Sequence, residues 1–304
     1  MIYTLTLNPA VDCVVHAKSI CAGGINRLDS EELYFGGKGI NVSIVLKELG
    51  IDSVATGFIA GFTGDAINDA VSSLGIKTSF VRLESGFSRV NIKIRSQGET
   101  DLNADGPIIP DSALSLLLKQ LAELRDGDTI ILSGSVPSSV PKSIYKNILE
   151  LLRGKEIYSV LDASGEALSL AMCESPSLIK PNLSELEELS GRRLCDISSI
   201  ISCCRELQSS GAREILVSLA EKGAVLVPEK GDAIILPAHK GSLVNSVGAG
   251  DSMVAGFTAG LTIFNGDRKK ALLLATAAGG ATAFSPGLAK KEDIMRLFEL
   301  TPAV

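Results

Sequence analysis

The chain has 304 residues, of which 45% are hydrophobic and 21% charged, proportions that fit a globular protein and exclude a disordered chain. Its net charge of −6 disfavours a partner held through a nucleic acid backbone, whereas one small phosphorylated ligand needs only a few well-placed cations. Aromatic residues make up 4%, tryptophan is absent and glycine accounts for 30 residues, which favours close backbone approaches over aromatic platforms.

Short apolar runs alternate with stretches of helical periodicity along most of the chain. The runs are nearly continuous in Val, Ile and Leu and predict strands buried on both faces, at 2–7, 54–59, 78–83, 129–132, 157–161, 177–180 and 214–219. The periodicity predicts helices at 40–49, 64–74, 111–124, 141–153, 183–190, 197–209, 250–264, 268–284 and 290–299. This alternation predicts an α/β fold, with helices covering a mostly parallel sheet in one domain.

Two segments interrupt the alternation, at about 11–35 and 88–106. In the second, Val90 and Ile92 alternate with Arg89, Asn91 and Lys93, a pattern typical of a half-exposed antiparallel strand pair. We expect the two segments to form a small β lid inserted in the domain. An ordinary surface hairpin is the alternative.

Gly36–Ser43 is a glycine-rich turn that opens a helix. It is not a Walker A loop, because Gly39 follows Lys38, and not a dinucleotide fingerprint, because Val42 stands where the third glycine belongs. The pattern fits either a ligand held close to the backbone, with Lys38 and Asn41 beside it, or a tight turn.

The segment from Lys180 to Glu185 joins a predicted strand to a predicted helix. Asn182 and Glu185 stand at the spacing of a helix capping box. The same amide and carboxylate are suited to hold a hydrated Mg²⁺, which keeps several waters and needs few protein ligands. Both interpretations stay open.

Asn245–Gly256 contains a second glycine-rich turn before a helix. Gly248, Ala249 and Gly250 are small enough for backbone amides to converge as an anion hole at the positive end of the helix dipole. Asp251 then stands within reach of a substrate hydroxyl beside the anion and is suited to act as a general base. A helix cap is the alternative for Asp251.

Three classes of feature are disfavoured. Six cysteines without Cys-x-x-Cys spacing and only two histidines, His16 and His239, argue against a zinc site. Residues 271–289 are uncharged but interrupted by glycines and Pro286, which predicts a buried helix rather than a membrane span. The N-terminus lacks the pattern of a signal peptide, and with free thiols this predicts a cytoplasmic protein.

Taken together, the motifs resemble those of the PfkB (ribokinase-like) carbohydrate kinase family. Both glycine-rich signatures of the family match, and further family features follow in order at Thr4–Asp12, Ser133–Pro137, Lys180–Glu185 and Val217–Gly223. The resemblance covers essentially the whole chain. It implies a ribokinase-like three-layer α/β/α sandwich with a β-sheet lid, and phosphorylation of a sugar by ATP with Mg²⁺.

The resemblance also implies roles for particular residues. Asp251 would be the catalytic base, beside an anion hole of Gly248, Ala249 and Gly250. The nucleotide would contact Lys180, Asn182, Ser218, Gly223, Ser246, Ala277 and Gly280, with aliphatic side chains around 277–284 holding the adenine. Mg²⁺ would be organised by Asn182 and Glu185, through water. The sugar phosphate would contact Asp12, Arg27, Gly37, Lys38, Asn41, Arg89, Asn103 and Ser133, with the three cations gripping the phosphate already present.

Within the family, Thr4–Asp12 and Lys38 resemble the branch that acts on phosphorylated ketohexoses. Asn103 favours fructose 1-phosphate, with tagatose 6-phosphate or fructose 6-phosphate as alternatives. A non-catalytic sugar-phosphate sensor is the alternative from another class, and a nicotinamide-dependent oxidoreductase is disfavoured. A monovalent cation is an optional cofactor, and a homodimer through the lid is expected. Ala220 and Ser139 depart from the family pattern, because each replaces a usual glycine.

Overall fold

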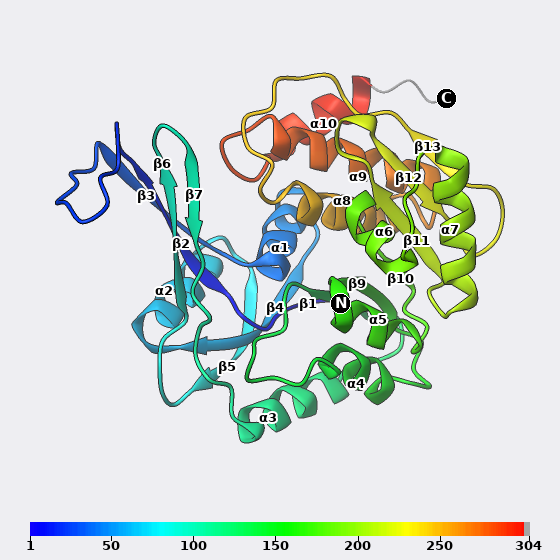
Figure 1. The fold of residues 1–304 in the computed structure, drawn as a ribbon. Helices are drawn as coiled ribbons and strands as arrows, with labels where there is room; N and C mark the ends of the chain where they lie inside the picture. The colour runs from blue at the N-terminus through cyan, green and yellow to red at the C-terminus, as the bar shows by residue number, and fades with distance from the viewer. Residues whose placement is uncertain (301–304) are drawn as a thin grey trace.

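A nine-stranded sheet, sheet A, forms the centre of the computed structural model, which describes residues 1–300 (Figure 1). In their order across the sheet, the strands are β13 (Ile234–Leu236), β12 (Ala224–Val227), β11 (Glu214–Ser218), β10 (Leu178–Ile179), β9 (Tyr158–Asp162), β8 (Thr129–Ser133), β1 (Ile2–Thr6), β4 (Ser53–Ala60) and β5 (Lys77–Leu83).

The seven strands from β11 to β5 run parallel, and they are the seven that the apolar runs predict. No apolar run predicted the short strands β12 and β13, and β12 pairs antiparallel with both β11 and β13. The chain turns into β12 at Gly223, whose φ is 99° and whose missing Cβ would lie 2.0 Å from the carbonyl oxygen of Leu236. Only glycine fits such a turn.

Helices cover both faces of sheet A within the described residues. They are α1 (Lys38–Glu48), α2 (Gly61–Ser73), α3 (Asp111–Ala122), α4 (Ile144–Leu151), α5 (Gly165–Met172), α6 (Leu183–Ser190), α7 (Ile197–Ser209), α8 (Ala249–Ile263), α9 (Arg268–Ala283) and α10 (Lys291–Leu300). One core packs sheet A against α3 to α7, and a second packs it against α1, α8, α9 and α10. The predicted three-layer α/β/α architecture is confirmed, and α5 is the one of these helices that the periodicity did not predict.

Helix α9 carries most of the long uncharged run. Eleven of its 16 residues are buried, and it packs between α8 and α10, as predicted for a buried helix. Across residues 1–300, no helix combines the length and the apolar character needed to cross a membrane.

A second, four-stranded sheet, sheet B, projects to one side of the body (Figure 1). Its strands lie in the order β3 (Ser30–Gly36), β2 (Ala10–His16), β6 (Arg89–Arg95) and β7 (Glu99–Leu102). The two segments that interrupt the α/β alternation therefore pair with each other, because β2 lies parallel to β6. The antiparallel β6–β7 hairpin is as predicted.

The two faces of sheet B differ in chemistry. One row across the four strands consists of Leu33, Cys13, Ile92 and Leu102, and its three large apolar side chains are 40–56% exposed. We call this the outer face. On the opposite face, the inner face, the rows carry Asp12 and Asn91, then Lys93 and Asp101. The alternation along β6 thus directs its polar residues toward the body.

Candidate active site

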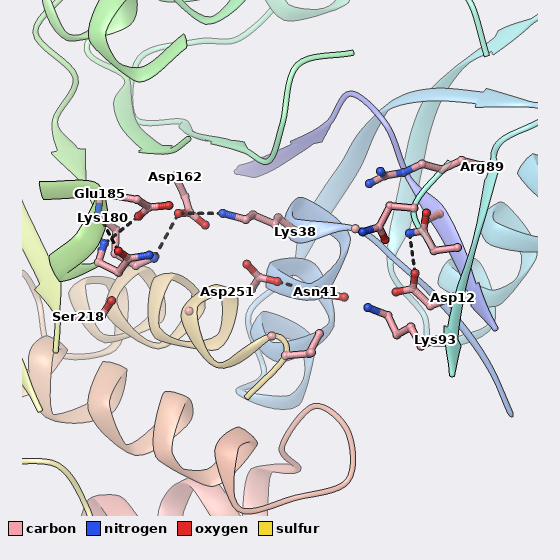
Figure 2. A pocket seen from close by; sticks show the side chains of 18 residues that line it. Asp12, Lys38, Asn41, Arg89, Lys93, Asp162, Lys180, Glu185, Ser218 and Asp251 are labelled. Atoms are coloured by element: carbon pink, nitrogen blue, oxygen red, sulfur yellow. Dashed lines mark hydrogen bonds and ion pairs between the residues drawn. The ribbon is translucent and has the colours of Figure 1, made fainter. Parts of the chain in front are cut away.

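A cavity of about 560 Å³ lies between the inner face of sheet B and the carboxyl ends of the parallel strands (Figure 2). Such an edge is where open α/β sheets bind ligands. The lining residues are Ala10, Asp12, Gly37, Lys38, Asn41, Arg89, Asn91, Lys93, Asn103, Asp162, Lys180, Asn182, Glu185, Ser218, Val247, Gly248, Gly250 and Asp251.

Asp251 occupies the first turn of α8 at the centre of the cavity and is only 6% exposed. Its Oδ2 accepts a hydrogen bond of 2.8 Å from Asn41 Nδ2. Gly248 is the N-cap residue, so Asp251 makes no side-chain capping bond, although as an acidic residue in the first turn it also complements the helix dipole. Burial, reinforced by the negative charge of Asp162, raises the pKa of Asp251 to about 6. The carboxylate is therefore poised for proton transfer near neutral pH.

The loop before Asp251 has the backbone geometry of an anion site. Gly248 has φ 82°, and a Cβ there would lie 2.6 Å from Leu288 Cδ2. The amides that follow open a helix of 15 residues, whose dipole favours negative charge at this end. A Cβ on Gly250 would lie 3.2 Å from Lys180 Nζ. A lysine ammonium thus stands directly beside the predicted anion hole.

Asp162 ties two lysines together next to this loop. It ends β9, its side chain is 2% exposed, and its Oδ1 lies 3.2 Å from Lys180 Nζ and 3.5 Å from Lys38 Nζ. Burial by itself would raise the pKa of Asp162, but the two ammonium groups outweigh burial and hold it below its ordinary value. Oδ2 of Asp162 is buried without a hydrogen-bond partner among the described residues. Figure 2 shows Lys38 directed at this carboxylate.

Asn182 and Glu185 form the capping box of α6. The Asn182 side chain accepts a bond from the Glu185 amide at 2.9 Å, and Glu185 Oε2 accepts one from the Asn182 amide at 2.8 Å. Both residues nevertheless line the cavity, and Glu185 Oε1 takes no part in the box. The capping interpretation is therefore confirmed, and it does not conflict with a role toward a ligand.

The opposite end of the cavity is formed by sheet B. Asn91 Nδ2 donates to Asp12 Oδ1 at 2.8 Å, and Arg89 Nε donates to the carbonyl oxygen of Asn8 at 3.2 Å. Lys93 lies farther along β6, and its ammonium is 3.4 Å from Asp101 Oδ2. Figure 2 shows Arg89 and Lys93 on either side of Asp12, at the end remote from Lys180.

The Gly36–Ser43 turn is tight because of its own packing. Gly37 has φ 139°, and a Cβ there would lie 2.6 Å from Thr6 Cγ2. A Cβ on Gly39 would lie 2.6 Å from the carbonyl oxygen of Leu5. These glycines allow α1 to start against β1, and this close packing brings Asn41 to Asp251.

The structure brings together most of the residues singled out in the sequence, but not all. Arg27 lies in the exposed loop between β2 and β3, away from the cavity wall. Ser133 is buried at the end of β8, where its Oγ has no hydrogen-bond partner among the described residues. The other residues outside the lining are Ala249, Gly223, Ser246, Ala277 and Gly280.

Sequence reasoning missed several residues that line the cavity. Asp162 follows directly on the predicted strand 157–161, and a charged residue at that position is a usable signal. Asn91 and Lys93 share the stripe of Arg89, so the two-residue period could have found them. No pattern in the sequence pointed to Ala10 or Val247 as cavity residues.

The two departures from the family pattern have different consequences. Ala220 has φ 50°, so it keeps a left-handed conformation that costs a non-glycine residue about 1–2 kcal/mol. Ser139 is not strained in this way, and its Oγ accepts a 3.1 Å hydrogen bond from the Ile109 amide. Neither residue lines the cavity.

Comparisons with known proteins identify related sequences over almost the whole chain. The model of the pfkB family of carbohydrate kinases matches residues 5–294. The chain is 40% identical over 297 residues to 1-phosphofructokinase of Bacillus subtilis, covering 98% of this chain and 97% of that protein. It is 36% identical over 289 residues to D-tagatose-1-phosphate kinase of Bacillus licheniformis, covering 95% and 94%.

Solved structures show the same fold. Phosphofructokinase-2 from Escherichia coli in complex with substrates and products matches with a TM-score of 0.91, at 27% identity and over 98% of each chain. That enzyme has also been solved in complex with potassium and in a tetrameric inhibited form.

Proposed function

The chain belongs to the pfkB family of carbohydrate kinases, and on that premise we propose that it transfers the γ-phosphoryl group of ATP to fructose 1-phosphate, yielding fructose 1,6-bisphosphate and ADP. The observation that carries the proposal is the buried Asp251 carboxylate, with its raised pKa, beside the Gly248–Gly250 loop and the Lys180 ammonium. These are a base, an anion site and a cation around one reaction centre.

The chemical step follows from this geometry. Asn41 occupies Oδ2 of Asp251, which leaves Oδ1 to take the proton of the acceptor hydroxyl. The hydroxyl oxygen forms a bond to the γ-phosphorus while the bond from that phosphorus to the β,γ-bridging oxygen breaks, and ADP leaves. The helix amides, Lys38 and Lys180 stabilise the negative charge on the transferring group. Positioning and charge stabilisation carry most of the catalysis of such transfers.

The nucleotide and its metal fit the wall formed by Lys180, Asn182, Glu185 and Ser218. Across residues 1–300, no group of three His, Cys, Asp or Glu side chains is suited to hold a metal. A donor set of one carboxylate and one amide suits Mg²⁺ that keeps its waters and binds nucleotide phosphates. Bound there, Mg²⁺ would neutralise charge on the phosphates.

The choice of sugar rests on the relatives. Two of them, from the two Bacillus species, are named for kinases of ketohexose 1-phosphates. Asn103, the residue that favoured fructose 1-phosphate in the sequence, lines the cavity. The proposal therefore ranks a 1-phosphate above fructose 6-phosphate and tagatose 6-phosphate.

The test is ADP release with fructose 1-phosphate, tagatose 1-phosphate, fructose 6-phosphate and tagatose 6-phosphate at sub-millimolar concentration. We expect the highest kcat/KM with fructose 1-phosphate. A preference for a 6-phosphate would overturn the substrate assignment. Binding of the sugar phosphates without ADP release would instead indicate the non-catalytic sensor.

We further propose that sheet B is a lid and that its outer face pairs two chains. Leu33, Ile92 and Leu102 leave an apolar row exposed, and apolar rows of this kind favour association. The test is the molar mass measured by light scattering at micromolar concentration, for the wild type and for Ile92→Glu, which places a charge in the apolar row. A wild-type monomer would contradict the pairing.

Two smaller expectations belong to the same proposal. Phosphofructokinase-2 of Escherichia coli has been solved in complex with potassium, and on that basis we propose that this chain also uses a monovalent cation. Potassium should then raise kcat above the value in sodium, and equal rates would contradict it. A cytoplasmic location is supported by six unpaired cysteines.

A further inference from the structure

The inner face of β6 presents three polar side chains to the cavity, at two-residue spacing: Arg89, Asn91 and Lys93. We propose that Lys93, opposite Arg89, binds the phosphate that the substrate already carries, and so makes the enzyme select a ketohexose phosphate over the free sugar. This inference rests on the proposed function and adds to it a specificity-determining residue.

The other cations near the cavity are engaged elsewhere or lie outside it. Lys38 and Lys180 both form ion pairs with Asp162 at the Asp251 end of the cavity, beside the Gly248–Gly250 loop, which we call the anion loop. Arg27 lies in an exposed loop and does not line the wall. Among the described lining residues, this leaves Arg89 and Lys93 at the remote end. A ketohexose phosphate whose free terminal hydroxyl meets Asp251 extends its phosphate toward that end.

Asn91, which lies between the two cations, is already engaged at both atoms of its side-chain amide. Its Nδ2 donates to Asp12 Oδ1 at 2.8 Å, and its Oδ1 accepts a 3.1 Å bond from the Ala104 amide. It therefore fixes the Asp12 carboxylate, which is suited to accept sugar hydroxyls. Asn91 carries no charge and has a single N–H left to donate, so the cations on either side of it are the stronger ligands for a phosphate.

Arg89 is positioned but not saturated. Its Nε donates to the Asn8 carbonyl oxygen at 3.2 Å, and one terminal nitrogen lies 3.5 Å from the Ala104 carbonyl oxygen. A guanidinium has five N–H donors, so donors remain for a phosphate oxygen. Arginine is well suited to such planar recognition.

Lys93 can leave its ion pair with Asp101 without leaving the Asp101 carboxylate unpaired. Its side chain is 14% exposed, and its one ion pair within residues 1–300 is the 3.4 Å contact with Asp101. Asp101 is also bound by Arg95 at 3.1 Å, a shorter contact. When Lys93 turns to a phosphate, Arg95 stays with Asp101. The pair of Asp101 and Arg95 thus keeps the lysine in place until the ligand arrives.

The alternative is that Lys93 is structural and exists to neutralise Asp101. The two roles separate cleanly by mutation of each partner. Substitution of Lys93 weakens sugar-phosphate binding under either hypothesis. The variant Asp101→Asn instead removes the carboxylate that pairs with Lys93 and leaves the lysine ammonium available to a phosphate. If Lys93 serves the phosphate, that change leaves binding intact or tighter. If it serves Asp101, both changes act alike.

The experiment measures the Kd of fructose 1-phosphate by titration calorimetry without nucleotide, together with KM and kcat for sugar phosphate and ATP. Lys93→Gln should raise Kd and KM for fructose 1-phosphate about 10- to 100-fold, the range for losing one hydrogen bond to a charged group. The KM for ATP should stay within about twofold. Lys93→Arg should recover part of the loss, and Asp101→Asn should not raise Kd. Lys77→Gln, the same charge change at an exposed position on β5, is the matched control.

The contrary results are equally definite. An unchanged Kd in Lys93→Gln, or a matching rise in Asp101→Asn, would overturn the assignment of Lys93. Failure of the wild type to phosphorylate any ketohexose phosphate would instead remove the proposed function. The calorimetric comparison still decides the role of Lys93 in that case, because it needs no turnover.

Discussion

The two ends of the cavity are constructed differently. At the Asp251 end, Asp162 and Lys180 are buried at the carboxyl edge of sheet A, and the Asp162 carboxylate binds both Lys180 and the partly exposed Lys38. At the sheet B end, Arg89 and Lys93 stand on a projecting sheet and keep donors free. Under the proposed function, the first end would be preorganised for a charge that develops during the reaction, and the second would keep donors free to bind and release a sugar phosphate.

Replacement of the base should break the first end most severely. We expect Asp251→Asn to lower kcat by at least the general-base range of about 10²- to 10⁴-fold, because no other group at this centre takes the proton. Nucleotide binding, measured by calorimetry, should stay near normal. Turnover at the wild-type rate would remove Asp251 from the mechanism.

Loss of the carboxylate between the lysines should be the next largest effect. Asp162→Asn should lower kcat about 10- to 100-fold, because a neutral amide does not hold two ammonium groups beside the anion loop. The KM for sugar phosphate should change little. The control is Glu214→Gln. Glu214 is a buried carboxylate paired with Arg268 at the amino end of β11, away from the carboxyl ends of the strands that border the cavity. Equal losses of kcat in both variants would indicate general destabilisation.

The pH profile tests the same end without mutation. Burial raises the pKa of Asp251 to about 6, and the base must be ionised, so kcat/KM should be level above this pH and fall about tenfold per unit below it. In Asp162→Asn the negative charge that helps raise this pKa is gone, so the acid limb should move to lower pH. If kcat/KM of the wild type fell only near pH 4, this would contradict the raised pKa that we attribute to the burial of Asp251. Circular dichroism at each pH confirms that the chain stays folded.

At the sheet B end, Arg89→Ala should raise the KM for sugar phosphate about tenfold with little change for ATP, because the lost bonds are far from the nucleotide wall. Arg82→Ala, at an exposed arginine on β5, is the matched control. Equal effects on both substrates would show that the two ends are not separate.

The smallest effect concerns a turn outside the cavity. Ala220→Gly should raise stability by about 1 kcal/mol, since glycine adopts the φ of 50° without strain. Tm should rise by about 2–4 °C in thermal unfolding. Ala66→Gly, within α2, should have the opposite sign because it removes a helix former. A fall in Tm for Ala220→Gly would show that the turn carries no strain.

Much of the fold followed from local patterns. Six of the seven parallel strands are largely buried and are recognisable in the sequence as apolar runs, whereas the edge strand β5 is only partly buried. The strands β12 and β13 were not recognised, because they are three or four residues long and adjoin a turn. In the site, Asp251 and the Gly248–Gly250 loop were predictable because a glycine-rich turn and the helix after it are contiguous in sequence.

The sequence by itself determined the α/β architecture, the glycine-rich turn that opens the helix of Asp251, and the family, because each depends on residues that are neighbours in the chain or repeat with a fixed period. Only the tertiary structure decided at which end of the cavity each cation lies. The sequence grouped Lys38 with Arg27 and Arg89, but the fold places Lys38 against Asp162, 124 residues away, and leaves Arg27 on an exposed loop. Long-range ion pairs depend on how strands align across a sheet, and no local pattern records that alignment.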